Sequence, residues 1–245
     1  MTTVLLVRHG RTASNTGGVL AGWTPGVSLD EAGRVQSEAL ANRLAPVPLA
    51  AVVSSPLERC VETAQLLVAG RNGQEVQLDD RLGEAHYGDW TGKELKKLAK
   101  DPLWKVVQAH PSAATFPGEH GESLRDTQAR AIASVREWNA KLGPEATWLA
   151  CSHGDVIKAV VADALGIHLD LFQRIVIDPC SLTVVTYTDL RPFVVRVNDT
   201  GGDVEALLPP KRRRPRRRTA DSDAVVGGGA GPSGANAGST EKPAG

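Results

Sequence analysis

Aromatic residues, paired cysteines and long apolar runs are all scarce in this chain of 245 residues. Phe, Trp and Tyr make up 4% of the sequence, and there are three cysteines. An odd number of cysteines without paired spacing argues against a disulfide framework or a cysteine metal site, and favours a reducing compartment. No apolar stretch reaches the roughly 18 residues needed to cross a bilayer, so we predict no membrane insertion.

Signatures of several processes are also absent. The start, MTTVLLVRHG, has no basic segment before its short apolar run, so we expect no signal peptide and a cytoplasmic protein. A cysteine-dependent phosphatase needs an arginine six positions after its cysteine, where this chain has Leu66, Ile157 and Thr186. There is no G-x-x-x-x-G-K-[ST] phosphate loop and no H-E-x-x-H metal motif. These absences exclude the cysteine mechanism and argue against P-loop nucleotide hydrolysis and a zinc site.

The formal net charge of zero conceals a basic C-terminal region. Residues 211–245 carry eight basic and three acidic side chains, which leaves the rest of the chain at −5. Residues 209–245 also have too few large apolar side chains to form a core, so we predict a domain over 1–208 and a disordered tail over 209–245. The run at 211–218 would bind nucleic acid or an acidic surface weakly, which keeps a polyanion-binding module as an alternative function.

The rest of the chain alternates between apolar strands and helices. Short apolar runs at 4–7, 50–53 and 147–151 are typical of parallel strands that are buried on both faces. Helical patterns follow these runs, and Ser28 and Ser55 are positioned to cap two of the helices. We expect further helices near 93–109 and 123–142, a strand at 76–78, and a closing hairpin at 182–197. This order predicts a doubly wound, mostly parallel α/β sheet flanked by helices.

Arginines and histidines follow the strands at the edge where such a sheet binds its ligands. Arg8 and His9 come directly after the first strand, and His153 follows the strand at 147–151. Arg59 lies one turn into the helix after the second strand. The next helix opens near Asp155, and its N-terminal dipole also favours an anion there.

This set of side chains fits phosphoryl transfer without a metal or a cofactor. Two guanidiniums can clamp a phosphate through bidentate hydrogen bonds, and a neutral imidazole can attack phosphorus as a nucleophile. The leaving alkoxide then needs a proton, for which Glu84 in RLGEAHYGDWTG is the best donor, with Asp89 and Asp155 as competitors. The expected substrate is a small-molecule phosphate ester, and the sequence carries no signal for an oligomeric state.

Four motifs in this order resemble those of the histidine phosphatase superfamily, also called the phosphoglycerate mutase-like family. They are RHGRTASN, SSPLERCVETA, GEAHYGDWTG and CSHGD, spread over residues 1 to about 200. The resemblance implies that His9 becomes the phosphohistidine and that Glu84 is the proton donor. It also implies that the phosphoryl group is held by Arg8, Arg59 and His153, with help from Asn15.

Three further residues are candidates for substrate binding. Gly154 belongs to the second histidine motif, and Trp23 is interpreted as either a core residue or part of the pocket. Arg11 stands where the family commonly has an acidic residue, and we hypothesise that it binds a second anion of the substrate.

The spacing of the motifs favours a phosphatase, with a phosphoglycerate mutase as the alternative. A mutase must hold a second anionic group, and its relatives carry extra basic residues in a long insertion before the second histidine. Here the insertion is short and holds no arginine between Gly92 and Leu124, although five lysines are present.

Overall fold

The computed structural model describes residues 1–202, 226, 227 and 229. The predicted disordered tail at 209–245 and its basic run therefore lie outside the described residues, except for those last three positions. The described chain forms a six-stranded sheet in the order β3-β2-β4-β1-β5-β6. Its strands are β1 (Thr2–Arg8), β2 (Val52–Ser54), β3 (Val76–Leu78), β4 (Thr147–Ser152), β5 (Leu182–Tyr187) and β6 (Pro192–Asp199).

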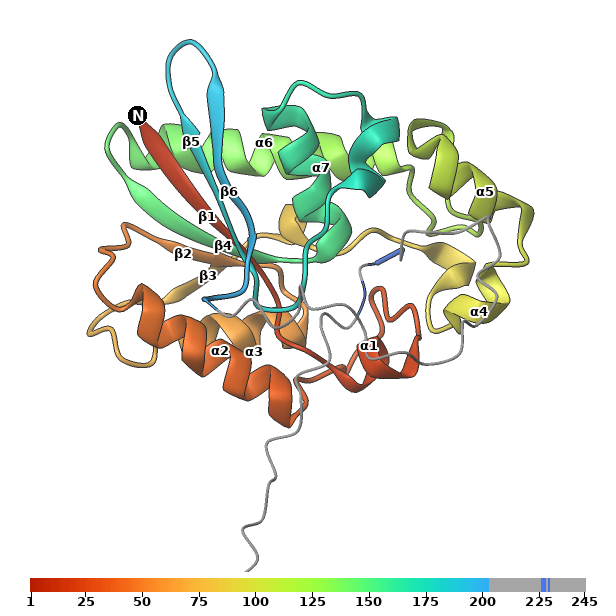
Figure 1. The fold of residues 1–245 in the computed structure, drawn as a ribbon, viewed down its shortest axis with the longest axis horizontal. Coiled ribbons are helices and arrows are strands. Elements are labelled where there is room, and N and C mark those ends of the chain that lie inside the picture. The colour runs from red at the N-terminus through yellow and green to blue at the C-terminus, as the bar shows by residue number, and fades with distance from the viewer. Residues whose placement is uncertain (203–225, 228, 230–245) are drawn as a thin grey trace, which may run out of the picture.

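The first four strands pair in parallel, and β5 and β6 are antiparallel additions at one edge. The helices are α1 (Ala13–Gly17), α2 (Glu31–Leu44), α3 (Glu58–Val68), α4 (Leu95–Leu98), α5 (Pro102–Ala109), α6 (Leu124–Leu142) and α7 (Gly154–Ala164). In Figure 1, α2 and α3 cover one face of the sheet and α6 and α7 cover the other. The predicted doubly wound, mostly parallel α/β fold is confirmed.

Strand β1 shows why its apolar run is continuous. Val4 and Leu6 pack in the same cluster as α6 and α7, whereas Leu5 and Val7 pack with α2 and α3. Successive side chains of a strand point to opposite faces, so a central strand between two helical layers needs apolar residues at every position. The run ends at the edge of the sheet, where polar residues begin.

Two helix starts differ from the expected ones. Asp30, not Ser28, caps α2 by accepting a hydrogen bond from the Gly33 amide. Helix α3 begins at Glu58, with Leu57 as its N-cap and no side-chain cap, so the prediction that Ser55 is the N-cap was wrong. The Ser55 hydroxyl instead lies 2.8 Å from the buried His153, which is described below.

A second apolar cluster lies beside the sheet and supports the segment after β3. It contains Tyr87, Trp90 and Phe116 with residues of α5 and α7, and it also includes Leu20 and Val226. Tyr87 and Trp90 both make edge contacts with Phe116. Leu20, Tyr87 and Val226 of this cluster line the pocket that His9 enters after β1, so the cluster forms one side of it.

Candidate active site

His9 lies directly after β1 at the end of the sheet. Its Nδ1 is 2.8 Å from the carbonyl oxygen of Gly10. Because a carbonyl can only accept, the proton is on Nδ1, and Nε2 keeps its lone pair. Burial, together with the charges of Arg59 and Arg8, holds the pKa of His9 well below its usual value. His9 is therefore a neutral, oriented imidazole.

Gly10 allows the chain to pass close to α2. A Cβ atom at this position would lie 2.6 Å from the carbonyl oxygen of Gly33, closer than side chains approach backbone. The glycine after the histidine therefore lets the loop turn against α2 without moving His9.

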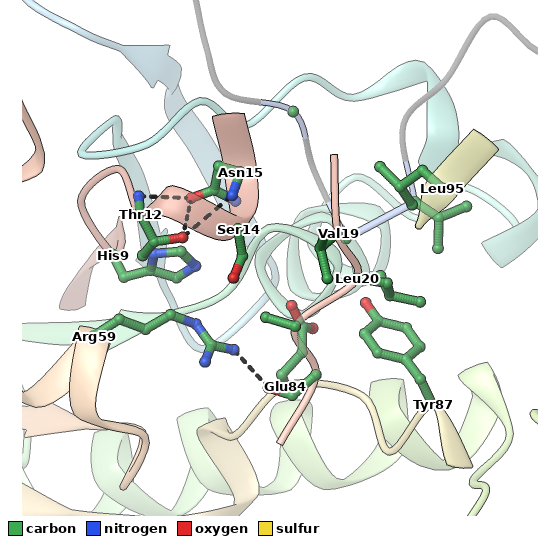
Figure 2. Close-up of a pocket in the computed structure, with 15 residues that line it drawn as sticks. His9, Thr12, Ser14, Asn15, Val19, Leu20, Arg59, Glu84, Tyr87 and Leu95 are labelled. Carbon is green, nitrogen blue, oxygen red and sulfur yellow. Dashed lines mark hydrogen bonds between the residues drawn. The ribbon is translucent and has the colours of Figure 1, made fainter. Parts of the chain in front are cut away.

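Arg59 extends from the first turn of α3 into the same space (Figure 2). Its Nη2 donates to the carbonyl oxygen of Gly22 at 2.8 Å and lies 3.2 Å from His153 Nδ1. Its Nη1 is buried, and no described residue accepts a hydrogen bond from it. A buried guanidinium nitrogen without an acceptor is a ready donor to an anion.

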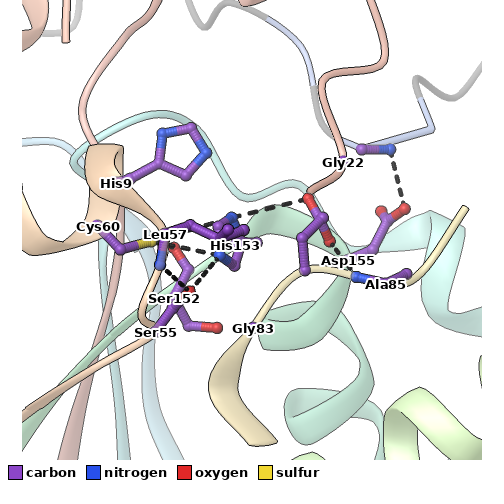
Figure 3. Close-up of polar contacts among 12 residues, drawn as sticks. His9, Gly22, Ser55, Leu57, Cys60, Gly83, Ala85, Ser152, His153 and Asp155 are labelled. Atoms are coloured by element: carbon purple, nitrogen blue, oxygen red, sulfur yellow. Dashed lines mark hydrogen bonds and ion pairs between the residues drawn. The ribbon is translucent and has the colours of Figure 1, made fainter. Parts of the chain in front are cut away.

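His153 is fully buried and lies beside Ser55 in Figure 3, with Arg59 at hydrogen-bond distance from its other ring nitrogen. Arginine only donates, so His153 Nδ1 is the acceptor and Nε2 carries the proton toward Ser55 Oγ, 2.8 Å away. Burial and the charge of Arg59 hold the pKa of His153 well below its usual value. The rings of His9 and His153 are 5.2 Å apart, so the two neutral imidazoles lie side by side.

Glu84 is a buried carboxyl group beside the neutral His153 and the cationic Arg59. Its Oε1 accepts a hydrogen bond from the Ala85 amide at 3.0 Å, and its Oε2 is 3.9 Å from His153 Nδ1. Burial and the negative charge of Asp155 raise the pKa of Glu84 to about 7, although Arg59 opposes the shift. A carboxyl group with this pKa can be protonated near neutral pH, as a general acid must be.

Arg8 is fully buried behind the pocket lining. Its Nη1 donates to the carbonyl oxygen of Ile177 at 2.8 Å and its Nη2 to that of Gly227 at 3.4 Å. Gly227 also donates its amide to Asp155 Oδ2 at 2.8 Å. Gly227, from the C-terminal region, therefore forms hydrogen bonds with both Arg8 and Asp155.

The pocket has a free volume of about 40 Å³. Asn15 is at its edge, where its Oδ1 accepts hydrogen bonds from the amide and hydroxyl of Thr12 in a capping box. The described lining residues are His9, Thr12, Ser14, Asn15, Val19, Leu20, Ala21, Gly22, Arg59, Glu84, Tyr87, Leu95, Val226, Gly227 and Gly229.

The predicted site residues differ in whether they line the pocket. His9, Asn15, Arg59 and Glu84 line the pocket. Arg8 and His153 lie buried behind the lining, in contact with it. Gly154 is the buried first residue of α7, directly after His153.

Arg11 and Trp23 are outside the lining. Arg11 Nε is paired with Asp30 at 2.8 Å, which holds its guanidinium at the start of α2 instead. Trp23 Nε1 donates to the carbonyl oxygen of Glu84 at 2.6 Å, and its ring stacks on His86. Trp23 therefore supports the loop that carries Glu84.

Two residues near the site were not found from the sequence. Ser55 was interpreted as a helix cap, although its place after β2 gave a signal for the sheet edge. Arg130, on α6, donates to the carbonyl oxygens of Arg81, Gly83 and Glu84. No local pattern links Arg130 to that loop, because only the packing of α6 brings them together.

Among the residues that the structure describes, no group of three or more histidine, cysteine or acidic side chains is arranged to hold a metal ion. No helix in this part of the chain is long and apolar enough to span a bilayer.

Comparison with known proteins identifies the class to which this pocket belongs. The model of the histidine phosphatase superfamily (branch 1) matches residues 4–200. A glucosyl-3-phosphoglycerate phosphatase of Mycolicibacterium vanbaalenii is 34% identical, over 68% of this chain and 76% of the relative. A 2,3-bisphosphoglycerate-dependent phosphoglycerate mutase of Gloeobacter violaceus is 28% identical, over 74% of this chain and 83% of the relative.

Solved structures show the same relationship. Bacillus stearothermophilus YhfR superposes with a TM-score of 0.74 at 30% identity, covering 81% of this chain and 98% of its own. The chain belongs to the histidine phosphatase superfamily. Its relatives include phosphatases and a phosphoglycerate mutase.

Proposed function

We propose that this chain hydrolyses small-molecule phosphate monoesters through a phosphohistidine at His9, without a metal or a cofactor. One observation carries the proposal. His9 is neutral with Nε2 unprotonated, and the same pocket holds the buried Arg59 Nη1, from which no described residue accepts a hydrogen bond. A phosphoryl group between them would satisfy the guanidinium and face the nucleophile.

The first half of the reaction transfers the phosphoryl group. His9 Nε2 attacks phosphorus, and the bond between phosphorus and the ester oxygen breaks as the N–P bond forms. Glu84 gives its proton to the departing oxygen and becomes a carboxylate. Its pKa of about 7 supports this role, because the proton is present near neutral pH and is released readily.

The second half restores the enzyme. Water attacks the phosphohistidine, Glu84 takes up the proton that the water loses, and the N–P bond breaks to release phosphate. Arg59 and Asn15, which line the pocket, hold the phosphoryl oxygens throughout. Arg8 and His153 join them when their hydrogen bonds to the Ile177 and Gly227 carbonyls and to Ser55 are exchanged for phosphoryl oxygens. The N-terminus of α7 at Gly154 adds a favourable dipole for the negative charge.

The lining supports a phosphatase over a mutase. Arg59 is the only described lining residue that is always cationic, and the side of the pocket beyond Glu84 is lined by Val19, Leu20 and Leu95. Two insertion lysines, Lys96 and Lys97, are largely exposed and paired with Glu94. A mutase substrate brings a second anionic group, and an apolar wall would leave its charge unpaired.

A substrate panel with two variants tests the proposal. The wild type should release phosphate from small esters, form an acid-labile phosphoprotein, and convert no 3-phosphoglycerate to 2-phosphoglycerate. His9→Ala should abolish both the release and the labelling, whereas the exposed His110→Ala should retain them. Phosphate release that survives in His9→Ala would contradict the proposed nucleophile. Isomerisation of 3-phosphoglycerate by the wild type would make the chain a mutase.

A further inference from the structure

The C-terminal region returns to the pocket far beyond the part of the chain that matches the family. The family match ends at residue 200, yet Val226, Gly227 and Gly229 all line the pocket. Val226 is 1% exposed and packs in the apolar cluster that includes Leu20 and Tyr87. These residues are therefore part of the pocket wall.

Gly227 is held there by backbone contacts that depend on its being glycine. Its amide donates to Asp155 Oδ2 at 2.8 Å, and its carbonyl oxygen accepts from Arg8 Nη2 at 3.4 Å. Its φ of 75° lies in the left-handed region. A Cβ atom would lie 2.8 Å from Leu20 Cδ1. Larger residues would be strained at this position.

The two sides of the pocket differ in chemistry. Figure 2 shows His9, Asn15 and Arg59 on one side of Glu84, and Leu20, Tyr87 and Leu95 on the other. In the proposed reaction Glu84 protonates the ester oxygen, so the phosphoryl group belongs on the first side and the organic group on the second. Val226 belongs to the same apolar cluster as Leu20 and Tyr87 and lines the pocket with them, which places it on the side of the organic group.

With these residues in place, little space remains. A free volume of about 40 Å³ is on the scale of a few water molecules, whereas pockets for larger organic ligands have roughly 300 to 1,000 Å³. An ester with a bulky organic group must therefore displace the wall, and a small one has much less to displace.

We propose that Val226 and Gly227 are specificity-determining residues, which close the organic-group side of the pocket and select phosphate esters with small organic groups. The inference rests on the proposed function for the position of the substrate. Val226 and Gly227 lie outside residues 4–200, which match the family model, and they would add to the residues that determine substrate specificity.

The test compares a small and a bulky ester, methyl phosphate and 1-naphthyl phosphate, in the full chain. Val226→Ala removes apolar volume from the wall and so enlarges the pocket, and Gly227→Pro removes the amide donor and cannot adopt the observed φ. Each variant should raise the ratio of kcat/KM for the bulky ester to that for the small one by about tenfold or more. The matched controls are the exposed Val176→Ala and Gly73→Pro, whose glycine has a similar φ of 73° and no heavy atom within 4 Å of a Cβ placed on it, and both should leave the ratio unchanged.

Binding gives a second readout that needs no turnover. The affinity for 1-naphthylphosphonate relative to methylphosphonate, measured by calorimetry, should rise in the same two variants. Thermal unfolding checks that each variant is folded. Unchanged ratios, or equal gains for both sizes, would overturn the inference. Turnover that persists in His9→Ala would instead overturn the proposed function, so the two failures are distinguishable.

Discussion

Arg130 Nη2 lies 2.9 Å from the carbonyl oxygen of Glu84. The same guanidinium reaches the carbonyl oxygens of Arg81 and Gly83 and forms an ion pair with Glu122. One side chain from α6 thus fixes the backbone of the loop that carries the proposed acid. Its planar fork of donors suits several acceptors at once, which a lysine cannot match.

We therefore expect Arg130→Lys to weaken catalysis through misplacement of Glu84. Loss of two or more carbonyl contacts should lower kcat/KM by about 10- to 100-fold. Arg136→Lys is a matched control on the same helix, because Arg136 is largely exposed and its ion pair among the described residues, with Asp163, is 3.5 Å long. Equal effects of the two substitutions on kcat/KM would refute a role for Arg130 in positioning the loop.

The pH dependence should follow the ionisation of Glu84, whose pKa of about 7 is raised by burial and then by the charge of Asp155. Because the acid must be protonated, the rate should fall as the pH rises through this value. Asp155→Asn removes one source of the upward shift, so the alkaline limb of kcat/KM should move to lower pH.

The ester's own ionisation is common to both proteins, so the difference between their profiles isolates the enzyme group. Asp163→Asn, on the same helix, is the control and should leave the alkaline limb of the kcat/KM profile at the same pH. If the alkaline limb of Asp155→Asn lay at an unchanged or higher pH, this would contradict the electrostatic coupling of Glu84 and Asp155.

Ser55 should stabilise the fold as well as orient His153. Ser55→Ala leaves the buried His153 Nε2–H with the weaker sulfur acceptor of Cys60, 3.4 Å away, which should cost roughly 1 kcal/mol of unfolding free energy. Ser54→Ala is a suitable comparison, because the Ser54 hydroxyl donates to the backbone carbonyl of Ser55 instead of a histidine. Urea unfolding measures both variants. A smaller loss for Ser55→Ala than for Ser54→Ala would count against the assigned hydrogen bond.

Asp79 should make stability sensitive to acid. Burial raises its pKa, but hydrogen bonds from Arg81, Ser134 and Trp138 outweigh this and lower it to about 2. A folded pKa below the unfolded value means that the stabilisation is present at pH values above about 4 and is lost as the pH falls toward 2. The loss should amount to roughly 2 kcal/mol.

Urea unfolding at pH 5 and pH 3 tests this for the wild type and Asp79→Asn. The variant should be less stable at pH 5 and should lose less stability than the wild type between the two pH values. An identical loss in both proteins would show that other carboxylates account for the acid sensitivity.

The position of His9 and His153 could be predicted because strand ends meet at one edge of a parallel sheet. β1 and β4 pair with Arg8 opposite Ser152, so the residues that follow these strands are neighbours. The sequence pattern of each strand contained that information. The state of the rings required the structure, since it depends on the Gly10 carbonyl and on Ser55.

Arg130 and Val226 could not be predicted, for different reasons. Arg130 acts across 46 positions in the chain, through the packing of α6 against a loop. Val226 lies in a glycine-rich stretch whose composition indicates no fixed structure. Arg11 is the opposite case, because its motif placed it at the site, yet its ion pair with Asp30 holds it elsewhere.

The central place of β1 links activity to the cooperativity of the whole domain. β1 is hydrogen-bonded to β4 on one side and β5 on the other, and both of its faces are covered by helices. Its amide protons should therefore exchange with solvent only when the entire sheet opens. His9 extends directly from this strand, so inactivation during denaturation should report global unfolding of the molecule and not local fraying near the pocket.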